Sequence, residues 1–306
     1  MPPSSPQSLV DCNLGFDLSN LEGKTAVVTG GANGIGEAYV QALVRARAFV
    51  YFGDINVDDG HRLASELLNT EFVPCDVTNW DDQMRLFQEA ASQSPSRRID
   101  YVVANAGISA KDEVFSFESE GPTKPTLKML DVNLIGSLYT TKIATHYFIN
   151  QHGQEQSTEQ HDTCLVLISS GAGYFDVPRT PQYCASKWAM RGIMHALRRT
   201  VYYYSSRVNI IALWYVKTKI LPEETFQHVA RSGVEFAKME DASECLLRIL
   251  SDKSINGKAL FIAARKWALR GYIDLDLDEY WDRDLLDEIR KDQIVSAPVE
   301  AGLFVE

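Results

Sequence analysis

A tyrosine and a lysine four positions apart could transfer a proton. Tyr183 and Lys187 lie in a stretch, residues 181–205, whose apolar spacing predicts a helix, and a spacing of four puts both side chains on one helical face. A phenol has a pKa of about 10, and a neighbouring ammonium lowers that pKa by stabilising the phenolate. The pair is suited to exchanging a proton with a substrate oxygen. A surface helix with an aromatic edge would show the same spacing.

Two more polar residues could join this pair. Ser170 ends a predicted strand, 164–168 extended by two serines, thirteen residues before Tyr183. A hydroxyl at the carboxyl end of a strand lies where open α/β sheets bind ligands, so Ser170 could hydrogen-bond the reacting oxygen. Asn133 lies in a long predicted helix, 126–151, and could hold a water that links Lys187 to solvent. The catalytic candidates are therefore Asn133, Ser170, Tyr183 and Lys187.

A glycine-rich turn could bind the phosphates of a dinucleotide. A predicted strand, 24–29, runs into Gly30, Asn33, Gly34, Ile35 and Gly36, and a helix is predicted over 34–47. Glycines there allow a tight turn and a close approach of backbone to pyrophosphate. The helix N-terminus adds free N–H groups and a positive dipole end. A merely structural turn is the alternative, but the strand–turn–helix context favours a nucleotide site.

An aspartate after the next strand bears on the choice of nucleotide. Asp54 follows the predicted strand 49–53, where a carboxylate can accept hydrogen bonds from ribose hydroxyls and repel a 2′-phosphate. The turn itself has Asn33 and no arginine, so NAD is favoured over NADP. A solvated turn residue is the alternative reading of Asp54. Further cofactor candidates follow the third and fourth predicted strands: Asp76, Val77, Asn105, Ala106 and Gly107.

The elements that must position these residues alternate along the chain. Strands are predicted over 24–29, 49–53, 71–74, 99–104, 164–168, 208–213 and 259–263, with helices over 34–47, 57–68, 79–92, 126–151, 181–205 and 241–251. This alternation is typical of an α/β fold of the Rossmann type, a doubly wound parallel seven-stranded sheet with helices on both faces. We expect one domain over 21–270, a flexible arm over 1–20, and an acidic C-terminal extension over 271–306.

Composition excludes several classes of function. The 306 residues carry a formal net charge of −11, which argues against nucleic acid or an anionic membrane surface as the partner. Residues 272–306 hold eleven acidic and three basic residues, so −8 of that charge lies there. Five scattered cysteines, no signal peptide and no long apolar run predict a cytoplasmic enzyme. No metal site is predicted, because the histidines lack ligand spacing and the acidic repeat at Asp274 lacks a calcium loop's glycine and final glutamate.

These residues, in this order, resemble the short-chain dehydrogenase/reductase family over about residues 22–265. The pattern is most similar to the branch that contains 15-hydroxyprostaglandin dehydrogenase, and also to polyketide alcohol dehydrogenases of the 5′-hydroxyaverantin type. The resemblance implies NAD(P)-dependent interconversion of a secondary alcohol and a ketone in a homodimer or homotetramer. It also implies that Asn133, Ser170, Tyr183 and Lys187 form a catalytic tetrad.

One segment departs from the family pattern. Leu213 and Trp214 stand where the family usually has Pro-Gly, although Val216 and Thr218 match and, by the resemblance, contact the nicotinamide carboxamide. The indole could narrow the site, stack on a flat substrate, obstruct the cofactor, or turn outward. A cyclase, an isomerase or a cofactor-free binding protein of the same fold is therefore the alternative function.

Apolar residues near this segment suggest the substrate. Residues 220–238 are expected to form a substrate lid that includes Phe226, and Phe175 in the loop before Tyr183 could line the same pocket. With Trp214, these side chains indicate an apolar or aromatic small molecule, and the resemblance implies a polyketide-like one.

Overall fold

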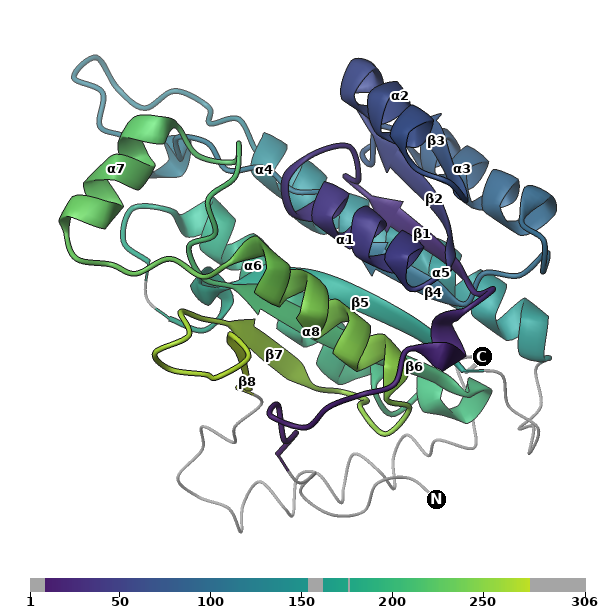
Figure 1. The fold of residues 1–306 in the computed structure, drawn as a ribbon. Helices are drawn as coiled ribbons and strands as arrows, with labels where there is room; N and C mark the ends of the chain where they lie inside the picture. The colour runs from purple at the N-terminus through teal and green to yellow at the C-terminus, as the bar shows by residue number, and fades with distance from the viewer. Residues whose placement is uncertain (1–8, 154–161, 176, 276–306) are drawn as a thin grey trace, which may run out of the picture.

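The computed structural model describes residues 9–153, 162–175 and 177–275. Its centre is one eight-stranded sheet with strand order β3-β2-β1-β4-β5-β6-β7-β8 (Figure 1). Pairing is parallel throughout except between β7 and β8, which are antiparallel. The strands are β1 (Thr25–Thr29), β2 (Phe49–Asp54), β3 (Thr70–Pro74), β4 (Tyr101–Ala104), β5 (Thr163–Ser170), β6 (Ser206–Leu213), β7 (Ala259–Ile262) and β8 (Tyr272–Asp274).

Helices cover both faces of this sheet, as the sequence predicts for a doubly wound fold. The central strands β1 and β4 are buried along their whole length, which is typical of parallel strands covered on two sides. One hydrophobic cluster packs under α1 and α8, and the other under α3, α5 and α6 (Figure 1). The helices are α1 (Gly34–Arg45), α2 (Val57–Glu66), α3 (Trp80–Gln93), α4 (Lys128–Leu130), α5 (Ser137–His152), α6 (Pro181–Leu197), α7 (Glu223–Arg231) and α8 (Met239–Ser251).

The strand count and the domain end differ from the prediction. We predicted seven strands and a domain that ends at 270, but β8 adds an eighth strand beyond that point. Its three residues are too few to show the alternation of polar and apolar side chains that identifies a strand. Because Asp274 is acidic, we assigned them to the acidic C-terminal extension. The structure buries that carboxylate instead, 3.4 Å from the ammonium of Lys258. The remaining tail, 276–306, lies outside the described residues.

The predicted flexible arm is also partly wrong. Its described part, from residue 9 onward, lies against the domain: Val10 N donates to Asp274 Oδ2 at 3.0 Å, Cys12 is buried, and Asn20 Nδ2 donates to Ser251 O at 2.8 Å. The Pro- and Ser-rich composition concealed these few anchoring contacts. Residues 1–8 lie outside the described part of the chain.

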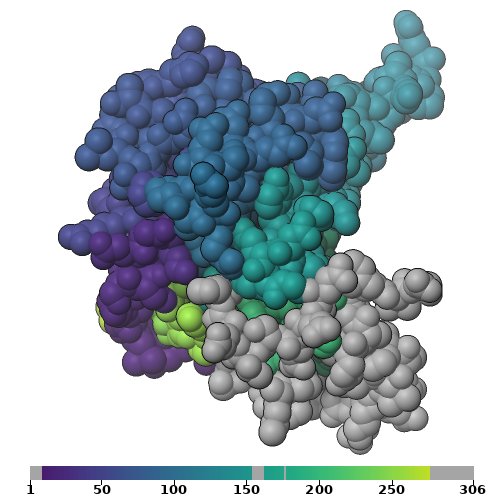
Figure 2. Space-filling model, turned by 90° about the vertical axis from the view of Figure 1, so that its right-hand side faces the viewer, coloured from purple at the N-terminus to yellow at the C-terminus, as the bar shows by residue number. Residues whose placement is uncertain are grey.

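The helix predicted over 126–151 is divided. A short α4 leads into a π-helical stretch, Asp131–Gly136, and then into α5. Such widened turns occur often at functional sites, and this one carries Asn133. The segment between β4 and α4 projects from the body of the molecule (Figures 1 and 2).

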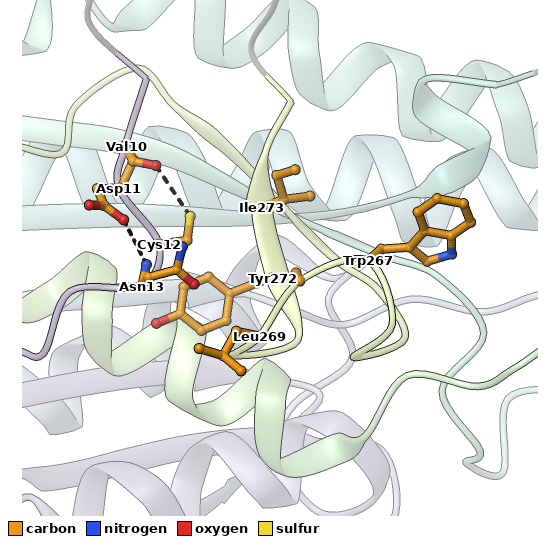
Figure 3. Close-up of a pocket in the computed structure, with 9 residues that line it drawn as sticks. Val10, Asp11, Cys12, Asn13, Trp267, Leu269, Tyr272 and Ile273 are labelled. Atoms are coloured by element: carbon orange, nitrogen blue, oxygen red, sulfur yellow. Dashed lines mark hydrogen bonds between the residues drawn. The ribbon is translucent and has the colours of Figure 1, made fainter.

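A hollow of about 330 Å³ lies near the sheet edge (Figure 3). Residues 10–13 form one wall, and the other comes from Trp267 to Ile273, around β8. It contains none of the predicted site residues. Within the described ranges, no helix combines the length and apolarity needed to cross a membrane.

Candidate active site

The sheet register brings the predicted site residues to one edge. Thr29 pairs with Ala104, and Ala104 with Leu167, so the glycine turn after β1 and the loop after β4 begin at the same level. On the other side, Ser170 pairs with Leu213. These are the carboxyl ends of parallel strands, where open α/β sheets bind ligands.

Lys187 lies in a buried, weakly polar environment behind Tyr183. Its Nζ lies 5.7 Å from the centroid of the Tyr183 ring and donates to Ile168 O at 3.1 Å. Only 6% of Lys187 is exposed. Burial penalises the ammonium and lowers the pKa of Lys187 from 10.5 to about 8. The side chain therefore titrates close to neutral pH.

Tyr183 is half-buried and lies beside Ser170. Burial raises the pKa of Tyr183, a hydrogen bond with Ser170 opposes that rise, and the nearby Tyr215 phenol adds to it. We expected Lys187 to lower this pKa, but burial raises it, and Lys187 is not among the groups that shift it. The neutral phenol is thus the stable form, and it can donate a proton to an oxygen held between Tyr183 and Ser170.

Asn133 fastens the loop after β4 to helix α6. Its Oδ1 accepts from Ile108 N at 2.8 Å, and its Nδ2 donates to Ile108 O at 3.0 Å and lies 3.3 Å from Ser186 Oγ. A Cβ added at Gly107 would lie 3.3 Å from Asn133 Oδ1 and 3.5 Å from Lys187 Nζ. Asn133 therefore lies close to Lys187, and its amide supports the loop, which we did not predict.

The turn after β1 has the geometry of a phosphate cradle. Gly30 has φ +65°, and a Cβ there would lie 2.7 Å from Ala106 Cα, while a Cβ at Gly36 would collide with the carbonyl oxygen of Gly30. Asn105 Nδ2 fixes the turn by donating to Gly30 O at 2.8 Å. Asn33, the N-cap of α1, makes no side-chain cap. The first N–H groups of α1, which include Ile35, thus remain suited to an anion.

Asp54 belongs to this turn and is not a solvated residue. Only 9% of it is exposed; its Oδ2 accepts from Ala32 N at 3.0 Å and its Oδ1 from Asn56 N at 2.9 Å. Thr218 reaches the turn from the other side, since its Cβ would lie 3.6 Å from a Cβ at Gly34. The structure therefore brings residues from β2 and from the segment after β6 to one turn.

The two residues expected near the adenine differ in exposure. Asp76 is exposed, and its Oδ1 accepts from Thr78 N at 2.9 Å. Val77 is buried against Gly136, where a Cβ would lie 2.8 Å from Val77 Cγ2. Of the two, only Asp76 is thus open to solvent.

Trp214 turns toward the loop that follows Ser170. A Cβ at Gly171 would lie 2.9 Å from Trp214 Cε3, so the indole occupies space that only a glycine leaves free. Its ring centroid lies 6.2 Å from that of Phe261 and 4.9 Å from that of Tyr215. The indole at position 214, where the family usually has glycine, thus fits because Gly171 has no side chain.

These contacts extend into a continuous set of rings, which we call the aromatic row. Phe175 packs edge-on against Phe261 at 5.8 Å, and at the other end Tyr215 lies 6.3 Å from Phe236. Phe236 lies 5.7 Å from Phe226, which is buried within the expected lid. The row consists of Phe175, Phe261, Trp214, Tyr215, Phe236 and Phe226. It joins the loop after β5, strand β7, the end of β6 and the lid segment.

The lid segment is attached to the end of β6. Val216 bridges to Ala237, and Ala237 N donates to Tyr215 O at 2.9 Å. Sequence reasoning placed Phe236 in the lid but missed Tyr215, Phe261 and Gly171 as parts of this region. Phe261 lies in an apolar strand and reads as core. One signal was available in the sequence. Leu213 and Trp214 replace the usual Pro-Gly of the family, and a bulky residue there requires other residues nearby to accommodate it.

Comparison with known proteins agrees with this geometry. The family model described as short chain dehydrogenase matches residues 24–228. The chain belongs to the short-chain dehydrogenase family. A 5′-hydroxyaverantin dehydrogenase from Dothistroma septosporum is 33% identical and is aligned over 91% of this chain and 96% of its own length. This short-chain dehydrogenase is thus related over nearly its whole length to a full-length member.

Other relatives differ in the cofactor that their names carry. An NADP-dependent dehydrogenase M3 from a Phoma species is 29% identical over 86% of this chain and 81% of that protein. The rat 15-hydroxyprostaglandin dehydrogenase [NAD(+)] is 28% identical over 81% and 93%. Among solved structures, a 3-ketoacyl-(acyl-carrier-protein) reductase from Brucella melitensis complexed with NADH has a TM-score of 0.66 at 23% identity. It covers 79% of this chain and 97% of its own, and shows the shared fold.

Proposed function

We propose that this short-chain dehydrogenase interconverts a secondary alcohol and a ketone on an apolar, aromatic small molecule and uses NAD. The observation that carries the proposal is the placement of Tyr183 next to Ser170, which ends β5, with the buried Lys187 ammonium 5.7 Å from the centroid of the phenol ring. Two hydroxyls at the carboxyl edge of the sheet can hold one substrate oxygen between them. A buried ammonium near the phenol can compensate charge that develops there.

Each residue then has a role in the reaction. In the reducing direction Tyr183 Oη donates its proton to the carbonyl oxygen, while Ser170 Oγ holds that oxygen in place. In the oxidising direction the deprotonated Tyr183 accepts the proton of the alcohol. Lys187 and Asn133 support the phenol and the adjoining loop. When bound, NAD would accept the hydride in the oxidising direction and NADH would donate it in the reducing direction, and the turn at Gly30, together with Thr218, would hold the nucleotide.

The choice of NAD over NADP rests on Asp54. Its carboxylate is held by two backbone N–H groups at the end of β2, so it cannot swing away from a ribose bound there. A ribose 2′-hydroxyl can donate to it, whereas a 2′-phosphate would be repelled. Fluorescence titration with NADH and NADPH tests this point. Tighter binding of NADPH would contradict the NAD assignment, and Asp54→Ala should weaken the preference for NADH.

The substrate class rests on the aromatic row. Trp214, Tyr215 and Phe261 join the loop beside Ser170 to the lid, and flat rings favour stacking against a flat substrate. The named activity of the Dothistroma relative is in keeping with a polyketide-like alcohol. A non-redox cyclase or binding role was suggested by Trp214, and binding of neither nucleotide in the titration would favour it. We also propose a homodimer or homotetramer, to be tested by light scattering.

A further inference from the structure

Helix α6, which carries Tyr183, has no N-terminal cap of its own. Its N-cap residue, Thr180, makes no side-chain hydrogen bond to the first turn. The next residue, Pro181, has no N–H to offer. The N–H of Gln182 is therefore the first free donor of the helix, and Asp112 Oδ2 accepts it at 2.7 Å from seventy positions away in the chain. The helix is thus capped by a different segment.

Both carboxylate oxygens of Asp112 accept hydrogen bonds, and the side chain is buried. Only 4% of it is exposed. Its Oδ1 accepts from Gln182 Nε2 at 3.1 Å and from Val114 N at 3.1 Å. A buried carboxylate is costly unless donors compensate it, and here the donors are N–H groups at the positive end of a helix. Without these contacts, the buried carboxylate of Asp112 would lose its donors, or the first N–H groups of α6 would lose their acceptor.

The segment that carries Asp112 is held to α6 at two places. Asn133 fixes Ile108 and approaches Ser186, three residues after Tyr183. Asp112, four residues after Ile108, holds Gln182, the residue directly before Tyr183. Asp112 belongs to the segment between β4 and α4, which projects from the body of the molecule (Figures 1 and 2). The reacting phenol is thus fixed from both sides by one loop.

The side-chain amide of Gln182 indicates that this arrangement orients α6 at a cost in folding stability. A carboxylate only accepts hydrogen bonds, so the amide nitrogen must face Asp112 and the oxygen must point away. That Oε1 is buried and has no hydrogen-bond donor within the described residues. A buried acceptor without a donor costs stability, and proteins tolerate such costs mainly at functional sites.

We infer that Asp112 is a positioning residue for proton transfer at Tyr183. Its carboxylate caps α6 from the loop after β4 and thereby holds the phenol in register with Ser170. The inference rests on the proposed function, because it assigns Asp112 to the same reaction. It predicts that Asp112 affects the rate of proton transfer and leaves the binding of the nucleotide unchanged.

The test uses the full-length protein with 1-tetralol as the aromatic secondary alcohol and NAD as the cofactor. For Asp112→Ala we expect kcat to fall about tenfold or more, since small misplacements of a reacting group cost this much. The Kd for NADH should stay within about twofold, and the solvent deuterium isotope effect on kcat should rise, because proton transfer becomes slower. Asp252→Ala, which removes a hydrogen-bonded carboxylate at the end of α8, is the matched control and should keep the wild-type kcat.

A second variant separates capping from other roles. Thr180→Asp in the Asp112→Ala background gives α6 a local cap, and it should recover a large part of kcat. No recovery, or a wild-type kcat in Asp112→Ala, would overturn the inference. Hydrogen exchange of residues 182–187 gives a readout without turnover: Asp112→Ala should speed it about tenfold, and unchanged exchange would also overturn the inference. Absence of turnover in the wild type would instead count against the proposed function.

Discussion

The two halves of the site are built in different ways. On the proposed nucleotide side, backbone groups and glycines of one short motif between β1 and α1 make the surface, and Asp54, Asn105 and Thr218 reach it from other elements. On the substrate side, side chains from β5, β6, β7 and the lid make the aromatic row, and its members are far apart in the chain. A surface made of backbone groups tolerates few substitutions, because most side chains would block it. A surface made of side chains can change by substitution of one residue at a time.

The largest effect is expected where the two halves meet. Tyr183→Phe removes the proton donor and keeps the ring, so kcat should fall about 10²- to 10⁴-fold, the range for loss of a general acid–base. NADH affinity, measured by fluorescence titration, should stay close to that of the wild type. A variant that retains most of its turnover would show that another group transfers the proton.

The nucleotide half should fail as a unit. Gly36→Ala places a Cβ against the carbonyl oxygen of Gly30, which is backbone and cannot move aside cheaply. We expect NADH binding to weaken by about tenfold or more, as the misplaced turn loses its contacts with the pyrophosphate. Titration calorimetry measures this loss. Gly192→Ala is a control, because a Cβ at Gly192 meets no atom within 4 Å. An NADH affinity in Gly36→Ala equal to that of the control would contradict the cradle.

The substrate half should change by degrees. Trp214→Gly restores the family residue and removes the centre of the aromatic row. We expect KM for an aromatic alcohol such as 1-tetralol to rise about threefold to tenfold, which corresponds to the loss of one aromatic pair, with little change in the Kd of NADH. Steady-state kinetics with each substrate measures the split. If the Kd of NADH rises and the KM of the alcohol does not, Trp214 contacts the nucleotide.

The last effect concerns stability and its dependence on pH, not turnover. Because burial lowers the pKa of Lys187 from 10.5 to about 8, the unfolded chain binds the extra proton between those values, and stability should rise as pH increases across that interval. Below it, the buried ammonium costs about 3 kcal/mol. Lys187→Met should therefore melt at a higher temperature than the wild type at pH 7, and the difference should shrink by pH 10. A constant difference across this range would contradict the shifted pKa.

Much of the fold and the nucleotide half could be predicted because the signals are local. The strand–turn–helix around Gly30, the serines at the end of β5 and the spacing of Tyr183 and Lys187 each lie within a few residues. Alternation of apolar strands and amphipathic helices gave the doubly wound sheet. The extra strand β8 was missed, since three residues carry no period and Asp274 looked solvated.

The missed site residues share a physical reason. Asp112 acts on a helix seventy positions away, and Phe261 reads as an ordinary core residue of β7. The space beside Trp214 depends on Gly171, which lies 43 positions earlier in the chain, and the sequence around Trp214 does not indicate that the two residues meet. Contacts between distant segments depend on tertiary packing, which neither spacing nor composition records.

The pairing of Val10 with Asp274 has a practical consequence for handling the protein. The two ends of the described chain meet at β8, the outermost strand of the sheet, and a short, covered outer strand is how sheets avoid joining to one another. Deleting residues 1–13, or fusing a rigid tag directly before Val10, should therefore favour aggregation and leave the chemistry at the distant strand ends intact. A tag with a long flexible linker should avoid that cost.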